Sequence, residues 1–159
     1  MKKRSILFLQ AVVILIALLS LAILIRFPLS EGRAENLDLF HIYTDPFIIY
    51  GYISSMAFFM GLYKAFQLLR YIRQNKLFTP AAIGILKNIR FCAIVIAVFI
   101  VLGGIYIRFN HHENDDPAGF LALCTIMTFV SLTVAVIIAV LEKALQNAID
   151  MKSENDLTI

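Results

Sequence analysis

Residues 117–141 read PAGFLALCTIMTFVSLTVAVIIAVL, an apolar stretch without a single charged side chain. A helix needs about 20 such residues to cross the hydrocarbon core of a bilayer. Three more stretches have the length and apolarity to span, helped by charged side chains that reach the interface from their ends. The sequence therefore predicts an all-α polytopic membrane protein, a bundle of four transmembrane helices forming one membrane domain over residues 1–159. We expect the spans at residues 5–27, 46–70, 86–108 and 117–141.

The overall composition supports this interpretation. Apolar residues make up 60% of the chain and charged residues only 16%, whereas soluble proteins average about 45–50% and about 25%. A soluble domain of 159 residues could not bury so much apolar surface, because small domains cover only about two-thirds of their accessible area. Lipid is therefore an expected partner of most of the chain.

Charged residues divide unequally between the two sides of the predicted spans. One side carries eleven cations and four acids, and the other three cations and seven acids, so the net charges are +7 and −4. Basic residues close to spans mark the cytoplasmic side. We therefore expect a multi-pass protein of the cytoplasmic (inner) membrane with both termini in the cytoplasm, an inner loop at 71–85, a cytoplasmic tail at 142–159 and outer loops at 28–45 and 109–116. The eleven cations are Lys2, Lys3, Arg4, Lys64, Arg70, Arg73, Lys76, Lys87, Arg90, Lys143 and Lys152.

The first span follows a basic start and resembles a secretory signal. Its apolar run is longer than the roughly 7–15 residues of a cleaved signal, and no convincing cleavage site follows Arg26. We expect an uncleaved anchor.

The two halves of the chain share a pattern. An Ile-Arg-Phe triplet ends the first and third spans, an acidic outer loop follows, and an Asp-Pro pair opens the next helix. Aspartate caps a helix and proline suits its first turn. The repeat consists of residues 25–27 with Asp45-Pro46 and residues 107–109 with Asp116-Pro117. It is explained either by a duplicated helical hairpin or by convergence on features that membrane helices commonly share.

Helix ends in the basic half can also be predicted. Thr79 and Pro80 fit the cap and first position of a helix, and Phe78 could pack on Ile83. We therefore expect the third helix to begin in the inner loop. The last helix should extend beyond the bilayer, because one apolar stripe continues past Glu142 through Leu141, Leu145, Ala148 and Met151.

Small residues predict where helices approach each other. Membrane helices pack through small side chains, and these lie along one side of the second helix and at one point of the third. Such contacts could join helices within one chain or in a homo-oligomer. The residues are Ser54, Ala57, Gly61, Ala65, Gly103 and Gly104.

Cys92 and Cys124 lie at different predicted depths and are expected to be free, buried thiols.

No ionisable residue lies at mid-membrane depth, which argues against an ion-coupled transporter. The fourth span carries only hydroxyls, which we expect to bond to their own helix: Thr125, Thr128, Ser131 and Thr133. Catalysis needs a base beside a nucleophile, or clustered metal ligands. No such cluster lies in the spans, so we expect no enzyme, no catalytic residues and no cofactor.

One cluster in the outer loops has ligand chemistry. Imidazoles and carboxylates together could bind zinc or copper, or respond to external acid. The simpler interpretation is a solvated loop that is acidic because it faces outward. The weak metal candidates are His41, His111, His112, Asp115 and Asp116.

The inner loop is basic and contains no acid. It could contact anionic lipid headgroups, at about 1 kcal/mol per cation, or dock an acidic cytoplasmic partner. The candidate residues for partner binding are Arg70, Arg73, Lys76 and Phe78.

Three motifs resemble a bacterial family of four-span membrane proteins, domain-of-unknown-function family 2975. They are residues 69–79 (LRYIRQNKLFT) with 86–89 (LKNI), the pair Asp116-Pro117, and the ending Glu154-Asn155-Asp156-Leu157-Thr158-Ile159. The resemblance implies a four-span bacterial protein with no assigned enzymatic activity, often encoded beside a small helix-turn-helix regulator. The ending alternates as an extended docking peptide would, or it is a disordered stub.

The leading hypothesis is a non-enzymatic membrane anchor or regulatory partner of a cytoplasmic protein such as a helix-turn-helix transcriptional regulator, with no direct nucleic-acid contact of its own. The partner candidates in the tail are Glu154, Asn155, Asp156, Leu157, Thr158 and Ile159. One alternative is a small oligomeric permease or channel subunit with a hydroxyl-lined or dewetting pore. The other is an external metal or pH sensor.

Overall fold

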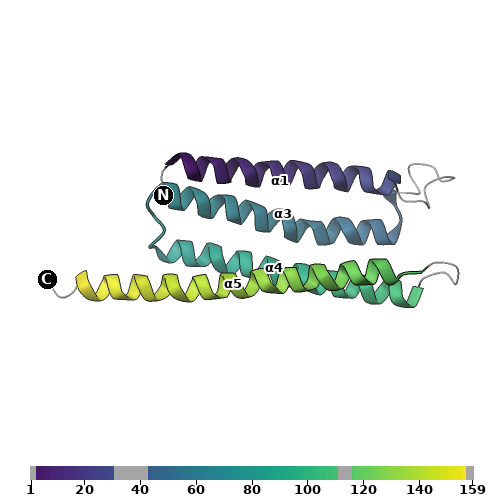
Figure 1. The fold of residues 1–159 in the computed structure, drawn as a ribbon. Helices are drawn as coiled ribbons and strands as arrows, with labels where there is room; N and C mark the ends of the chain where they lie inside the picture. The colour runs from purple at the N-terminus through teal and green to yellow at the C-terminus, as the bar shows by residue number, and fades with distance from the viewer. Residues whose placement is uncertain (1–2, 31–42, 111–115, 157–159) are drawn as a thin grey trace.

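A computed structural model describes residues 3–30, 43–110 and 116–156 of the chain, and these form four long helices (Figure 1). The helices are α1 (Lys3–Ser30), α3 (Pro46–Arg73), α4 (Pro80–Asn110) and α5 (Ala118–Asp156). All four are long and apolar enough to cross a membrane. The prediction of an all-α protein with four membrane spans is confirmed.

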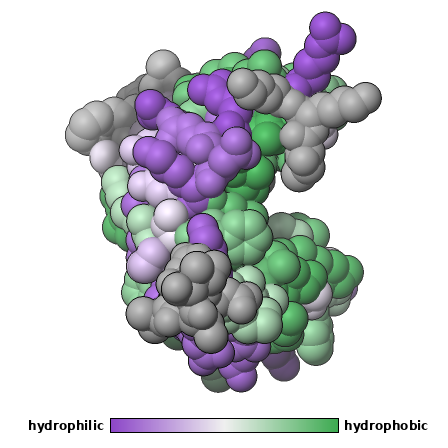
Figure 2. Space-filling view, turned by 90° about the vertical axis from the view of Figure 1, so that its left-hand side faces the viewer, coloured by the Kyte–Doolittle hydropathy of each residue, from purple (hydrophilic) through white to green (hydrophobic). Residues whose placement is uncertain are grey.

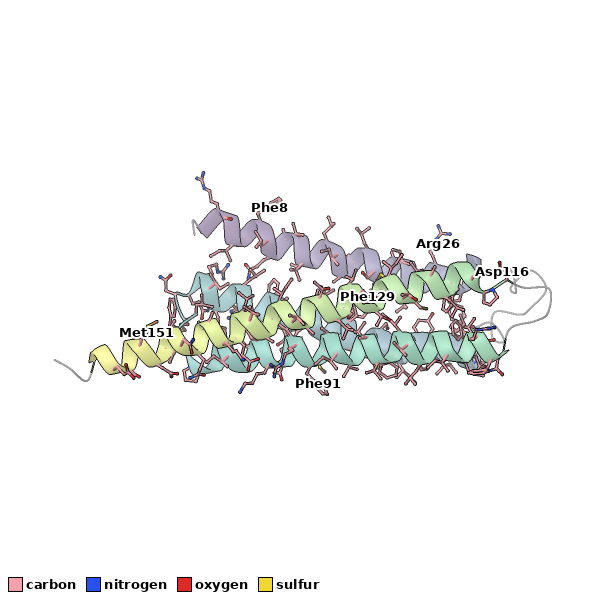
Figure 3. The ribbon with its side chains drawn as sticks, turned by 60° about the horizontal axis from the view of Figure 1, so that its bottom comes forward. Phe8, Arg26, Phe91, Asp116, Phe129 and Met151 are labelled. Carbon is pink, nitrogen blue, oxygen red and sulfur yellow. The ribbon has the colours of Figure 1, made fainter. Side chains whose placement is uncertain are left out.

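The helices run alternately up and down, so the molecule has two charged ends. At the basic end lie the start of α1, the end of α3, the start of α4 and the end of α5 (Figure 1). The acidic end holds their other termini. The 39 residues of α5 extend over about 58 Å at 1.5 Å per residue, against a hydrocarbon core of about 30 Å. Figure 3 shows the Met151 end of α5 projecting beyond α1.

Helix α4 is the central element of the fold. It packs most extensively on α5 and then on α3, while α1 packs mainly on α3. Most of the fully buried residues belong to α4, and large apolar side chains elsewhere point outward, as Phe8 on α1 and Phe129 on α5 do (Figure 3). Lipid is the medium that suits such an exterior, because a soluble surface rarely exposes wide apolar patches.

Glycines set the close approaches of α4 to both neighbours. A Cβ added to Gly61 of α3 would lie 3.5 Å from Cys92, and one added to Gly104 would lie 3.6 Å from Cys124 of α5. Gly103, on the other side of α4, faces the ring of Tyr50 on α3. The predicted small-residue contacts at these three glycines therefore form within one chain. Both cysteines are free; Cys92 is buried and Cys124 is half-buried.

Three of the four hydroxyls on α5 bond to their own helix, as predicted. Thr125, Thr128 and Thr133 donate to the carbonyls four residues earlier. The prediction is wrong for Ser131, whose hydroxyl donates to the carbonyl of Ala93 on α4 at 3.0 Å. The close packing of α4 on α5 brings that carbonyl within reach, so Ser131 joins the two helices.

Helix α1 continues through Pro28 to Ser30, three residues past the expected span end. Proline has no N–H, so the carbonyl of Leu24 loses its helical donor. The hydroxyl of Tyr52 on α3 donates to that carbonyl at 3.3 Å. A neighbouring side chain that satisfies the freed carbonyl is what allows proline inside a membrane helix.

The two predicted Asp-Pro starts adopt the same cap. Oδ1 of Asp45 accepts the N–H of Phe47 at 2.7 Å, and Oδ1 of Asp116 accepts the N–H of Ala118 at 3.0 Å. Each carboxylate also lies at the positive end of its helix dipole. The predicted capping role of both aspartates is confirmed.

Candidate functional site

The basic end of the molecule has an apolar core of its own. Ala82, Ile83 and Leu86 of α4 and Leu145 of α5 form a buried cluster. The start of α4, the end of α3 and the extension of α5 are thereby held together. Partly buried apolar side chains surround this cluster: Leu68, Tyr71, Leu77, Ile138 and Ile149.

The apolar stripe predicted on the extension of α5 was only partly right. Leu145 is buried, but Leu141 is 49% and Met151 60% exposed. The inward positions are Ile138, Leu145 and Ile149, which are spaced as one helical face. The helix is therefore rotated relative to the expectation, and this rotation turns Glu142 inward as well.

The turn between α3 and α4 has a defined geometry. Asn75 has a φ of 56°, in the left-handed region that asparagine tolerates after a helix end. The N–H of Asn75 donates to the carbonyl of Ile72, and that of Lys76 to the carbonyl of Tyr71. These two bonds form the Schellman arrangement that closes a helix. The basic side chains on either side of Asn75 are thus carried by a fixed turn.

Helix α4 begins at Pro80, as predicted. The Thr79 hydroxyl donates to the carbonyl of Lys76 at 2.8 Å and so stabilises the turn. Phe78 is 54% exposed, and Leu77 packs on the buried cluster that contains Ile83. Leu77 is therefore the residue of this turn that packs on the cluster, while the Phe78 ring is largely on the surface. The expected contact of Phe78 with Ile83 stays a prediction.

Glu142 makes the main ion pair of this region. One carboxylate oxygen lies 3.2 Å from Nη1 of Arg90, and the other lies 4.0 Å from Nζ of Lys87. The Glu142 side chain is only 13% exposed, and the contact with Arg90 is an ion pair without an aligned hydrogen bond. This ion pair was not predicted from the sequence, although basic residues in the first three turns of α4 and an acid in the last helix were the available signal.

Three further cations, in and beside the turn between α3 and α4, have no carboxylate to balance them among the described residues. The sequence contains no Asp or Glu from Pro46 to His112, and Glu142 is already occupied. Arg70, Arg73 and Lys76 are exposed, and none of them forms an ion pair with a residue in the described part of the chain. We call these three side chains the basic triad. Figure 2 shows hydrophilic residues gathered on this end of the molecule.

A cavity of about 350 Å³ lies beside the triad. Arg70 and Lys76 contribute cations, and two tyrosines, two glutamines and a phenylalanine complete the wall. Close by, Lys64 lies 3.5 Å from the amide oxygen of Gln67 and 5.8 Å from the centre of the Tyr63 ring. The lining contains donors and aromatic faces but no carboxylate, so it suits an anionic group. The lining residues are Tyr63, Phe66, Gln67, Arg70, Tyr71, Gln74 and Lys76.

The comparisons with known proteins agree with the fold. Residues 28–159 match the family model described as "Protein of unknown function (DUF2975)". The chain belongs to this family. It is also 36% identical to the uncharacterized membrane protein YoaS of Bacillus subtilis (strain 168), over the full length of both chains. No solved structure matches it.

This DUF2975 member is thus a membrane protein with four candidate spans, and the predicted family is confirmed. That the ending at residues 154–159 is typical of the family stays a prediction. The match includes residues 154–159, but a docking role of that ending stays a prediction. Residues up to Asp156 continue α5 as helix, and the two alternatives for the ending, an extended docking peptide or a disordered stub, stay open. Leu157, Thr158 and Ile159 lie outside the described residues.

The predicted metal cluster at the acidic end is mostly outside the described part of the chain. His41, His111, His112 and Asp115 are among the residues whose structure is not described. Asp116 is described, and its carboxylate caps α5. Among the described residues, no three His, Cys, Asp or Glu side chains come together in a way that could hold a metal ion.

Proposed function

We propose that this protein is a non-enzymatic anchor in the bacterial cytoplasmic membrane and that its basic end binds an acidic segment of a cytoplasmic protein. In this proposal both termini lie in the cytoplasm, as the distribution of basic residues favours. The family resemblance makes a small helix-turn-helix regulator the first partner to test.

The proposal rests on a contrast at the basic end: some cations form ion pairs, and others form none with a described residue. Glu142 balances Arg90 and Lys87, whereas no described residue forms an ion pair with the basic triad. Side chains fixed on an ordered frame lose less conformational entropy on binding than side chains on a mobile loop. The Schellman turn at Asn75 and the buried cluster beneath it supply that frame.

Aromatic and amide groups next to the triad support a protein partner. Arginine and aromatic residues are enriched where proteins bind each other. Phe78 is exposed beside the triad, and the adjoining cavity offers Tyr71 and Gln74 to a side chain of the partner. The extension of α5 carries Met151, which is 60% exposed, to the same side of the molecule (Figure 3).

Crosslinking in the native cell tests this proposal. We would compare the wild type with a variant carrying Arg70→Glu, Arg73→Glu and Lys76→Glu, and identify crosslinked proteins by mass spectrometry. The expected result is a cytoplasmic partner whose crosslinks map to the basic end and whose recovery with membranes falls at least tenfold in the variant. Since like charges in an interface cost several kcal/mol, the effect should be large.

A matched control uses cations of the same end that lie outside the triad. Lys143 and Lys152 are exposed on α5, and replacing both with glutamate should leave partner recovery near that of the wild type. Equal loss in control and triad variants would show a general charge effect and contradict a specific site. A label on Asn75 that reacts from outside the cell would also contradict the proposal, because the triad would then face away from the cytoplasm.

A further inference from the structure

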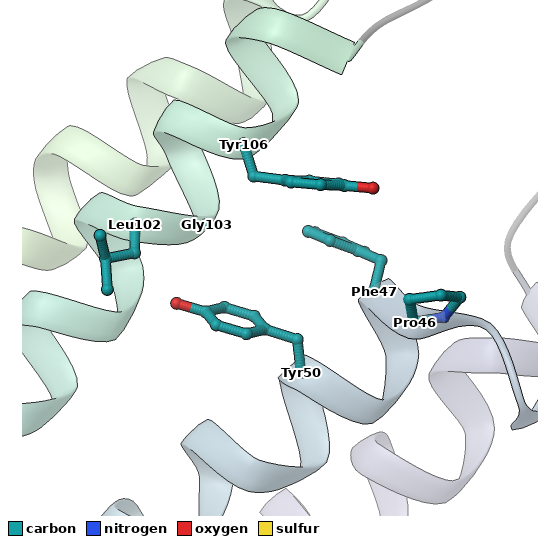
Figure 4. Close-up of a pocket in the computed structure, with 6 residues that line it drawn as sticks. All are labelled: Pro46, Phe47, Tyr50, Leu102, Gly103 and Tyr106. Carbon is teal, nitrogen blue, oxygen red and sulfur yellow. The ribbon is translucent and has the colours of Figure 1, made fainter.

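A second cavity, of about 250 Å³, lies at the opposite end of the molecule between α3 and α4 (Figure 4). Three of its six lining residues are aromatic and none is charged. Its volume is below the roughly 300–1,000 Å³ of common ligand sites, so it suits a small ligand or one chemical group. The lining residues are Pro46, Phe47, Tyr50, Leu102, Gly103 and Tyr106.

Contacts outside the cavity hold two of its three aromatic rings, and the third ring stacks on one of these two. The Phe47 N–H is held by Asp45, and its ring meets Phe120 of α5 edge-on at 6.1 Å. The Tyr50 hydroxyl donates to the carbonyl of Phe99 at 2.6 Å. Tyr106 stacks against Phe47, with ring centres 6.2 Å apart and planes 17° apart. The rings are therefore positioned before any ligand enters.

Gly103 makes room for this arrangement. A Cβ at this position would lie 3.3 Å from Cε1 of Tyr50, which is closer than an unstrained contact between carbon atoms. The backbone of α4 thus forms one wall of the cavity, and Figure 4 shows Tyr50, Phe47 and Tyr106 on the opposite and adjoining sides. Even the smallest side chain here would press on the Tyr50 ring.

The chemistry of the wall selects a class of ligand. The faces of aromatic rings carry negative partial charge and attract cations within about 6 Å, most strongly where water is excluded. A metal ion would need oxygen or nitrogen ligands, and the six lining residues provide no carboxylate or imidazole. An alkylammonium ion needs neither, because its charge is spread over apolar groups that can contact the rings directly.

The charge around the cavity favours the same ligand. By sequence, this end of the molecule carries seven acids against three cations, and Asp45 directly precedes the lining residue Pro46. An excess of acids in the segments that flank this end favours cations over anions there. We propose that this cavity binds a small water-soluble quaternary alkylammonium ion. A lipid headgroup fits less well, since its ammonium group comes with a phosphate and the lining offers no cation to that phosphate.

The test uses the full-length protein in nanodiscs whose lipids lack ammonium groups, with empty nanodiscs as reference. Radiolabelled choline is the probe. The competitor is its neutral isostere, in which a tert-butyl group replaces the trimethylammonium group. We expect saturable choline binding that tetraethylammonium displaces and that the isostere displaces at least tenfold more weakly. No saturable binding, or equal displacement by the isostere, would overturn the proposal.

Two variants and two controls locate the site. Tyr106→Leu, at a residue that is 51% exposed and so tolerant of change, should weaken choline binding about tenfold. Gly103→Ala should weaken it without removing any chemical group. Phe91→Leu changes a ring that is 65% exposed on the half of α4 nearer the basic end (Figure 3), and Gly51→Ala adds a methyl group where no atom lies within 4 Å. Both controls should bind like the wild type, and loss of binding in the controls equal to that in Tyr106→Leu would overturn the assignment.

A second series of nanodiscs distinguishes a soluble ammonium ligand from the ammonium group of a lipid. Adding phosphatidylcholine to the nanodiscs should leave the apparent affinity for free choline unchanged. Loss of choline binding in proportion to that lipid would identify a headgroup as the occupant and overturn the proposal of a soluble ligand. This site lies at the opposite end from the basic triad, so its test and the crosslinking test can fail independently.

Discussion

The two helical hairpins start alike in sequence and are held together differently. Between α4 and α5, Gly104 packs on Cys124, Ser131 bonds to a carbonyl of α4, and Glu142 forms ion pairs with Arg90 and Lys87. In the first hairpin, Tyr52 of α3 donates to the carbonyl of Leu24, and Tyr43, just before α3, donates to the carbonyl of Ile25. The shared Asp-Pro signals therefore specify where helices begin, while the strength of packing is set by residues that the halves do not share.

The difference predicts an order of opening. Regions with few buried contacts open most readily, and α1 has the least extensive packing of the four helices. We expect α1 to separate from the other helices before α4 and α5 separate from each other. The following substitutions challenge that order, beginning with the largest expected effect.

The first prediction concerns the close approach of α4 and α5. Gly104→Leu should destabilise the protein by about 1–3 kcal/mol, because a bulky side chain must displace Cys124 and Leu121. Reversible unfolding in lipid bicelles measures the change. Gly84→Leu on the same helix is the control, since no atom lies within 4 Å of its added Cβ. Equal destabilisation by both would mean that helix propensity, not the contact, determines the effect.

The second prediction concerns the ion pair at the basic end. Glu142→Gln should cost about 1 kcal/mol, because it leaves Arg90 and Lys87 without a partner while both can still reach water. The same unfolding assay in a background of Lys87→Gln and Arg90→Gln isolates the coupling. In that background Glu142→Gln should have little effect. A full effect there would show that Glu142 stabilises the helices through other contacts.

Much of the fold was predictable because membrane insertion imposes simple rules. Apolar length located all four helices, and Asp45, Pro80 and Asp116 marked the starts of three of them. Both rules are local: a cap or a span depends on residues close in sequence. For that reason the predictions at these positions were confirmed without any knowledge of how the helices pack.

The errors arose where an outcome depends on another helix. The inward face of α5 differs from the predicted stripe because the extension of α5 packs on the start of α4. The sequence of one helix does not specify the surface of the helix it packs against. Ser131 was misassigned for the same reason, because its partner Ala93 lies 38 residues earlier in the chain and on another helix.

The aromatic cavity was missed although its residues are visible in the sequence. Phe47 and Tyr50 lie one turn apart on α3, but Tyr106 is more than fifty residues later. Aromatic residues near a span end ordinarily indicate an interfacial belt. Only the antiparallel pairing of α3 with α4 places the three rings around one space, with Gly103 between them.

The last and smallest effect is expected at the contact between α1 and α3. Tyr52→Phe removes the hydroxyl that satisfies the Leu24 carbonyl, at a cost of about 0.6 kcal/mol. Local opening near Pro28 should rise about threefold, measured as amide hydrogen exchange in α1. Exchange in α4 and α5 should not change, because their contacts do not pass through Tyr52.

The controls for this prediction bear directly on the comparison of the hairpins. Tyr63→Phe removes a hydroxyl from a ring that is 64% exposed and should leave exchange in α1 unaltered. Ser131→Ala breaks a single interhelical bond in the other hairpin. Its effect on exchange should be smaller than that of Tyr52→Phe, because Gly104 and Glu142 still hold α4 to α5. If Ser131→Ala loosened α5 more than Tyr52→Phe loosens α1, the second hairpin would depend on that bond, and α1 would not be the first helix to separate.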